Sequence, residues 1–191
     1  MRDIRPVLDN ALSMAQAFLA QHVEAGDVVV DATMGNGYDT EFLARLVSPG
    51  GSVFAFDTEQ KALEETKIRI STIDQNSVFL VKESHEFISR HVPQGIKAAV
   101  FNLGYLPGGD RQSTTVAAVT VRAVANLLPL LGKDGIIVIV VYRGHEEGKR
   151  EWNALVEYGS QLPRSPYSVS MCDFINQPND PPGFIGIQRR N

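Results

Sequence analysis

The sequence of 191 residues is poor in cysteine and tryptophan, with one of each, and it contains no long apolar run. A single thiol, Cys172, can form neither an internal disulfide nor a zinc site built from several thiolates. No apolar run approaches the roughly 18–20 residues that a membrane-spanning helix needs. There is no signal-like apolar segment at the start of the chain. These absences predict a cytoplasmic protein with no membrane segment.

Positive charge is also scarce, since 18 Lys and Arg face 22 Asp and Glu for a net charge of −4. This balance argues against a protein that coats long stretches of nucleic acid with cationic side chains. The deficit lies in residues 1–95, with 8 basic and 14 acidic residues, whereas residues 96–191 have 10 and 8. The asymmetry fits two halves with different roles, and equally an uneven distribution of surface charge.

What is present is typical of a folded protein, with 43% hydrophobic and 21% charged residues. The length fits a single domain over 1–191. Short apolar segments predict strands at 28–33, 52–57, 78–81, 97–102, 135–142, 166–175 and 183–189. Helical patterns lie between them at 7–22, 40–46, 59–71, 86–90, 113–130 and 147–158. This alternation predicts an α/β fold with a mostly parallel seven-stranded sheet, helices on both faces and an antiparallel hairpin at one edge.

The turn after the first strand is Gly35-Asn36-Gly37, where an α/β sheet binds ligands and glycines permit close backbone approach. It lacks both the third glycine of a dinucleotide site and the Gly-Lys of a phosphate loop. Asp57 ends the second strand 20 residues later, where an acid can bind a ribose diol or simply cap the next helix. A nucleoside without a phosphate site indicates S-adenosylmethionine (SAM).

Other polar residues surround this predicted site. Asp31 and Asp39 flank the turn and could face the ammonium of SAM, although Asp31 could instead support the turn. Ser84 and His85 follow the third strand, where they would reach the adenine end or begin a helix. The remaining histidines are scattered, so we expect no metal site.

The loop after the fourth strand begins Asn102-Leu103-Gly104-Tyr105 and is the most unusual segment of the chain. It resembles the (Asp/Asn)-Pro-Pro-(Tyr/Phe) motif of amino-group methyltransferases, with Leu103-Gly104 in place of Pro-Pro. In such a loop the Asn oxygen accepts a hydrogen bond from the amine and the aromatic ring stacks on the target, so that positioning supplies much of the rate. The alternative is a plain turn capped by Asn102.

Six segments together resemble the small class I methyltransferases of the rRNA methylase family: 31–40, 56–60, 84–85, 102–110, 142–145 and 176–182. The resemblance covers nearly the whole chain and implies a Rossmann-like domain with a cofactor half at 1–95 and a substrate half at 96–191. It implies cofactor contacts at Met34, Asn36, Asp39, Asp57, Gln60, Ser84 and His85. It places catalytic groups at Asn102, Tyr105, Asp110 and His145, and substrate contacts at Tyr105, Arg111, Tyr142, His145, Pro181 and Pro182.

Members of this family include a tRNA methyltransferase that acts on the amine of 5-aminomethyl-2-thiouridine at the wobble position. The resemblance therefore implies the tRNA anticodon loop as partner, and analogy makes a homodimer compatible with the chain. Transfer to an amine requires loss of a proton, either to Asp110, Tyr142 or His145 or through desolvation. A local basic surface would come from some combination of Arg111, Arg122, Arg143, Lys149 and Arg150, and the others would form an ordinary solvated face. Methylation of another RNA base or of a small-molecule amine, and SAM binding without turnover, are the alternatives.

Overall fold

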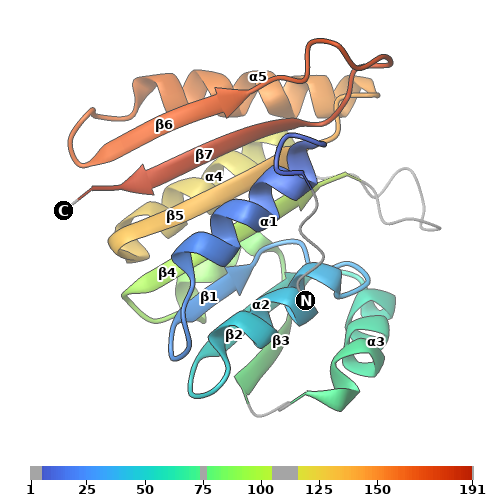
Figure 1. Cartoon of the computed structure of the whole chain (residues 1–191), viewed down its shortest axis with the longest axis vertical. Helices are drawn as coiled ribbons and strands as arrows, with labels where there is room; N and C mark the ends of the chain where they lie inside the picture. Colours follow the sequence, from blue (N-terminus) through green and yellow to red (C-terminus); the bar gives the residue numbers. More distant parts are fainter. Residues whose placement is uncertain (1–5, 74–76, 105–115, 191) are drawn as a thin grey trace.

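The computed structural model describes residues 6–73, 77–104 and 116–190, which form one twisted sheet between two layers of helices (Figure 1). The sheet order is β3-β2-β1-β4-β5-β7-β6. β7 runs antiparallel to both β5 and β6, and the pairs among β1 to β5 are parallel. The strands are Val28–Asp31 (β1), Ser52–Asp57 (β2), Val78–Lys82 (β3), Ile96–Leu103 (β4), Leu131–Val141 (β5), Tyr167–Cys172 (β6) and Gly183–Arg189 (β7).

The α-helices are Ala11–His22 (α1), Tyr38–Val47 (α2), Gln60–Arg69 (α3), Ala117–Leu127 (α4) and Glu146–Gln161 (α5). Short 3-10 helices lie at Ile70–Thr72 (η1), His85–Arg90 (η3) and Leu128–Leu130 (η4). Helices α1 and α2 cover one face of the sheet, and α4 and α5 cover the other (Figure 1). In the described ranges, no helix is long and apolar enough to cross a lipid bilayer.

The central strand β5 shows why the sheet needs cover on both sides. Ile137 and Ile139 belong to the core under α4 and α5, whereas Val138 and Val140 belong to the core under α1 and α2. All four side chains are fully buried. Because successive side chains of a strand point to opposite faces, an uninterrupted apolar run is what a doubly covered strand requires.

The predicted fold class is confirmed, and the differences concern the ends of elements. Helix α1 begins at Ala11 rather than residue 7, because the Asn10 side chain caps it by accepting the Ser13 N–H at 2.9 Å. Helix α2 begins at Tyr38, directly after Gly37. The predicted edge hairpin has β6 as the edge strand, with β7 inserted between β5 and β6. Because β1 pairs in parallel with both β2 and β4, the carboxyl ends of these three strands lie at the same edge of the sheet.

Candidate functional site

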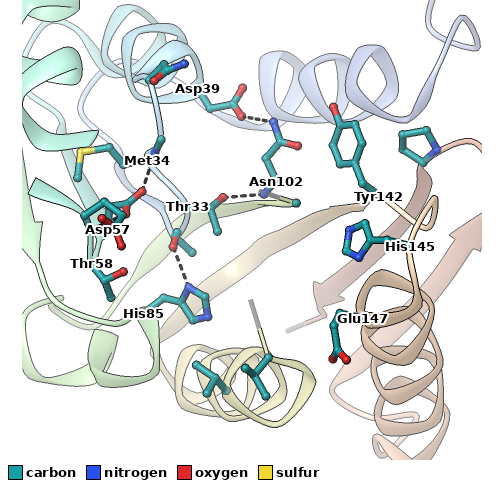
Figure 2. Close-up of a pocket in the computed structure, with 18 of the residues that line it drawn as sticks. Thr33, Met34, Asp39, Asp57, Thr58, His85, Asn102, Tyr142, His145 and Glu147 are labelled. Atoms are coloured by element: carbon teal, nitrogen blue, oxygen red, sulfur yellow. Dashed lines mark hydrogen bonds between the residues drawn. The ribbon is translucent and has the colours of Figure 1, made fainter. Parts of the chain in front are cut away.

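A cavity of about 1560 Å³ lies over the carboxyl ends of the parallel strands. Its wall combines the β1–α2 turn, the ends of β2, β3 and β4, the segment between β5 and α5, and the loop before β7. Figure 2 shows Asp57 and His85 on one side of it and Tyr142 and His145 on the other, with Asn102 between them. Segments far apart in the chain therefore share one site.

The β1–α2 turn has the conformation that its glycines predict. Gly35 and Gly37 have φ angles of 51° and 79°, in the left-handed region that glycine tolerates best. A Cβ atom on Gly37 would lie 2.7 Å from Thr66 Oγ1 and 2.9 Å from Thr66 Cα. The turn therefore packs directly against α3, and no larger residue fits at Gly37.

Helix α3 also fixes the turn by two hydrogen bonds to its carbonyl groups. Thr66 Oγ1 donates to the Gly35 oxygen at 3.1 Å, and Arg69 Nε donates to the Asn36 oxygen at 2.7 Å. The Arg69 guanidinium also lies 3.5 Å from the centre of the Tyr38 ring. With its carbonyls engaged in this way, the turn is a rigid wall of the cavity.

Asp57 closes the same corner from the end of β2. Its Oδ2 accepts the Gly35 N–H at 3.0 Å, and its Oδ1 accepts the Glu59 N–H at 2.9 Å. A carboxylate has about four acceptor positions, so two remain for a ligand. Asp57 thus supports the turn and the start of α3 and still has the capacity to bind a diol.

His85 is a buried histidine with one open nitrogen. Its Nδ1 lies 3.1 Å from the Ala32 carbonyl oxygen, and because a carbonyl can only accept, Nδ1 carries the proton. Burial lowers the pKa of His85, so the ring is neutral near pH 7. Its Nε2 is buried and has no hydrogen-bond partner in the part of the chain that the structure describes. Nε2 is therefore an acceptor in the cavity wall.

Asp31 supports the turn from within the protein. It is fully buried, its Oδ2 accepts the Thr40 hydroxyl at 2.6 Å, and its Oδ1 accepts the Thr33 N–H at 3.1 Å. Burial and, second to it, the nearby charge of Asp39 together raise its pKa to about 7. Of the two roles that the sequence left open for Asp31, the geometry favours support of the turn.

Asn102, at the end of β4, is held at two points. Its backbone N–H donates to Thr33 Oγ1 at 2.7 Å, and its Nδ2 donates to Asp39 Oδ2 at 3.2 Å (Figure 2). Its Oδ1 is buried and has no partner among the described residues. Burial raises the pKa of Asp39, while hydrogen bonds from the Asn102 and Gln16 side chains lower it. Asn102 thus presents an open acceptor in the centre of the site.

Tyr142 and His145 lie beyond Asn102. Tyr142 is 40% exposed, and burial of its hydroxyl raises its pKa, so the phenol is protonated at neutral pH. His145 caps α5, with its Nδ1 accepting the Gly148 N–H at 3.1 Å. That contact occupies the nitrogen lone pair that a general base at Nδ1 would need.

The loop before β7 is tied to the cavity by two basic side chains. Arg143 donates from Nε and Nη2 to the Pro181 oxygen at 3.1 and 2.8 Å, contacts Asp173 and stacks on Trp152. Lys149 Nζ lies 3.2 Å from Asp180 Oδ2. Arg143 and Lys149 are among the residues considered for an RNA-binding surface, and in the structure both contact this loop.

The other basic residues of that expected surface also have acidic partners. Arg122 Nη2 lies 2.9 Å from Glu86 Oε2, and Arg150 Nη1 lies 2.7 Å from Glu147 Oε1. Arg111 is outside the described residues. The four described members of this group therefore each have an acidic partner in the structure.

The structure brings most of the predicted site residues to one cavity: Met34, Asn36, Asp39, Asp57, Ser84, His85, Asn102, Tyr142, His145, Pro181 and Pro182. Gln60 is the exception, because it lies outside the lining and its amide donates to Glu64 Oε1 at 3.1 Å within α3. Tyr105, Asp110 and Arg111 fall outside the described residues. No group of three or more His, Cys, Asp or Glu within the described ranges is placed to hold a metal ion.

Several lining residues were not singled out from the sequence, among them Thr33, Thr58, Glu83, Gly104, Val116 and Val119. Thr58 directly follows β2, and Thr33 lies two residues after the end of β1, at the edge where an α/β sheet binds its ligands. Their position near the strand ends could have identified them from the sequence. Val116 and Val119 come from the start of α4, and their approach to the site depends on the tertiary packing.

The cofactor side of the cavity fits an adenosine ligand. It has a glycine turn open to close approach, free acceptor positions on Asp57, and the buried Nε2 acceptor of His85, which could accept from an exocyclic amine. It has no Gly-Lys phosphate loop. These features suit a nucleoside whose tail carries no phosphate.

Comparisons with known proteins agree with this geometry. The family model described as "Putative rRNA methylase" matches residues 53–188. A chloroplastic tRNA (mnm(5)s(2)U34)-methyltransferase of Arabidopsis thaliana is 31% identical over 192 residues, which cover 95% of this chain and 70% of that protein.

Solved structures match over almost the full length. A Clostridium thermocellum protein with the same rRNA-methylase description has a TM-score of 0.92 and 37% identity, covering 95% of this chain and 98% of that one. A Streptococcus mutans protein described as a methyltransferase, solved in complex with SAH, has a TM-score of 0.87 and 32% identity with the same coverage. SAH is what SAM becomes when it gives up its methyl group. The chain therefore belongs to the rRNA methylase family and is a SAM-dependent methyltransferase with the class I fold.

Proposed function

We propose that this protein is a cytoplasmic tRNA N-methyltransferase. It would convert 5-aminomethyl-2-thiouridine at the wobble position to 5-methylaminomethyl-2-thiouridine. The observation that carries the proposal is the open, buried Oδ1 of Asn102, because an amide oxygen suits the N–H of an amine. The name of the Arabidopsis relative supports the choice of tRNA.

The roles of the residues follow from their positions. SAM, when bound, supplies a methyl group that is already activated for transfer. The turn at Gly35, Asp57 and His85 would hold its adenosine part, and Asn102 would orient the acceptor amine. Positioning of this kind can supply much of the rate of a transfer reaction.

The proton of the amine needs a separate account, since an alkylamine is largely protonated at neutral pH. Tyr142 is a poor acceptor because its raised pKa keeps the phenol protonated, and His145 Nδ1 is occupied by the Gly148 N–H. Neither the Tyr142 hydroxyl nor His145 Nδ1 is therefore available to accept the proton. The geometry therefore favours loss of the proton as the amine leaves water, with Asn102 accepting from the neutral amine.

Transfer of labelled methyl groups from SAM to total tRNA, taken from cells that lack this gene, tests the substrate. Label in 5-aminomethyl-2-thiouridine is the expected result. Label in another base, or in a small-molecule amine alone, would replace the proposed acceptor with one of the alternatives. SAM binding without any transfer would make the protein a non-catalytic binder.

The Asn102→Ala variant tests the site itself. It removes the open acceptor, so we expect kcat to fall by about 10- to 100-fold, the scale of one lost buried hydrogen bond in a transition state. The affinity for SAM should stay within about threefold, measured by calorimetry. Asn153→Ala is the matched control, because Asn153 is exposed on α5 outside the cavity. Unchanged kcat in Asn102→Ala would refute the role of this residue.

A further inference from the structure

The direction in which the Asn102 amide points is decided by its neighbour. A carboxylate offers only acceptors, so Asp39 can bind the NH₂ group of Asn102 but not its oxygen. The carboxamide oxygen must then face away from Asp39, and Figure 2 shows it on the side of Tyr142. Without that constraint, rotation of the amide by half a turn would present a donor to the cavity in place of an acceptor.

Asp39 is built into the protein in a way that suits this task. It is 6% exposed, lies in the first turn of α2, and receives a second hydrogen bond from the Gln16 side chain on α1. The backbone of Asn102 is fixed independently by Thr33 Oγ1. Main chain and side chain of Asn102 are therefore held by two different residues of the β1–α2 segment.

We propose that Asp39 is a positioning residue for the acceptor amine: by accepting from Asn102 Nδ2, it fixes Asn102 Oδ1 toward the substrate. This assignment moves Asp39 from the cofactor contacts expected for it to the acceptor side of the site. It rests on the proposed N-methyltransferase function. It also narrows the class of methyl acceptor, since a site that offers an oxygen favours a group that can donate a hydrogen bond, as an amine does.

An exchange of the two side chains tests this role directly. In Asp39→Asn, both residues carry amides, and either end of Asn102 can face its neighbour. In Asn102→Asp, two carboxylates stand where donor and acceptor stood 3.2 Å apart. In the double variant Asp39→Asn/Asn102→Asp, the amide at position 39 donates to the carboxylate at 102, whose second oxygen again faces the cavity.

We expect each single variant to lose about tenfold or more in kcat for the amine, the scale of a misdirected buried hydrogen bond. The double variant should recover to within about threefold of the original protein, a non-additivity expected of two residues in direct contact. The dissociation constant of SAM, measured by calorimetry, should stay within about threefold in all three. If Asp39→Asn does not fold, Asn102→Asp against the double variant carries the comparison.

Three results would contradict the inference in distinguishable ways. A double variant no more active than the worse single one would overturn the positioning role, while the proposed function stands. A loss of SAM affinity that accounts for the loss of activity would return Asp39 to the cofactor. If the original protein methylates no amine, the proposed function fails and the inference with it.

Discussion

The two sides of the cavity differ in how their polar groups are used. On the cofactor side, the turn carbonyls, the Asp31 carboxylate and both oxygens of Asp57 already have partners within the protein. On the acceptor side, the oxygen of Asn102 has none in the described chain. The cofactor side is thus mainly a braced turn, with His85 Nε2 as an unpartnered buried acceptor, whereas the acceptor side depends on the oxygen of Asn102.

This difference reflects what each side has to recognise. The cofactor is held by a backbone turn whose conformation hydrogen bonds already fix, which reduces the conformational entropy that the protein loses on binding. The methyl acceptor must be oriented rather than bound tightly, and one correctly directed oxygen, that of Asn102, can orient it. The two sides should therefore respond differently to substitution, in stability and cofactor affinity on one and in turnover on the other.

The charged residues that line the cavity are mostly acidic. Among the described residues, Lys61 and Arg143 are the basic members of the lining, and seven members are acidic: Asp39, Asp57, Glu59, Glu83, Glu146, Glu147 and Asp180. A negative cavity attracts the positively charged sulfonium group of SAM. The overall net charge of −4 thus fits the small ligands, and tRNA would have to be bound at a local surface, with modest dependence on salt.

The largest effect is expected from Gly37→Ala, which disrupts the braced turn itself. The left-handed φ of 79° costs an alanine roughly 1–2 kcal/mol, and the new Cβ would overlap Thr66. We expect a marked fall in the unfolding free energy and a loss of SAM affinity of about tenfold or more, measured by urea unfolding and calorimetry.

Gly50→Ala is the matched control for that experiment. Gly50 has a φ of 87°, but a Cβ there would meet no atom within 4 Å. It carries the backbone strain without the clash, so its SAM affinity should be unchanged. Equal losses of affinity in both variants would contradict the view that the packing of Gly37 on Thr66 shapes the cofactor side.

An intermediate effect is expected on the acceptor side from Arg143→Leu, which frees the Pro181 loop. The Michaelis constant for the acceptor should rise about 3- to 10-fold, a fraction of what charge-assisted hydrogen bonds are worth, with SAM affinity unchanged. Arg150→Leu is the control, since the Arg150–Glu147 pair is exposed and such pairs contribute little. A loss of SAM affinity in Arg143→Leu would contradict the separation of the cofactor side from the acceptor side.

The remaining prediction concerns the pH dependence of stability rather than turnover or affinity. The pKa of Asp31 is about 7 in the folded protein against 3.8 as its ordinary value, so between these values the folded state binds more protons than the unfolded state. The free energy of unfolding should therefore fall as pH rises from about 4 to 7. Asp31→Asn should flatten this slope, measured by urea unfolding at pH 5 and 8, whereas exposed Glu157→Gln should not. An unchanged slope in Asp31→Asn would exclude Asp31 as its source.

Much of the fold was predictable because the signals are local. The apolar runs of β1, β2, β4 and β5 and the turn at Gly35-Asn36-Gly37 follow from neighbouring residues, and so does the position of Asp57 at a strand end. Polar residues at or shortly after the carboxyl ends of parallel strands lie at one edge of the sheet. That rule is sufficient to bring Asp57, His85 and Asn102 toward one site.

The contacts of Gln60, Arg143 and Lys149 could not be predicted from the sequence, for a different reason. Gln60 follows Asp57 closely in sequence, yet its position on the exposed side of α3 turns it toward Glu64 rather than the cavity. Arg143 and Lys149 look like free basic residues in the sequence, and only the fold brings them to Pro181 and Asp180. Side-chain partners from distant segments do not appear in a local pattern.

The sequence by itself determined the order of strands and helices, the glycine turn and the polar residues at the strand ends, because each depends on residues close together in the chain. Only the tertiary structure decided which atoms stay open for a ligand. Asn102 is separated from Asp39 by 63 residues, and their contact sets the direction of the amide. The chemistry of the site depends on that direction, and a hydrogen bond between distant segments exists only once the sheet has formed.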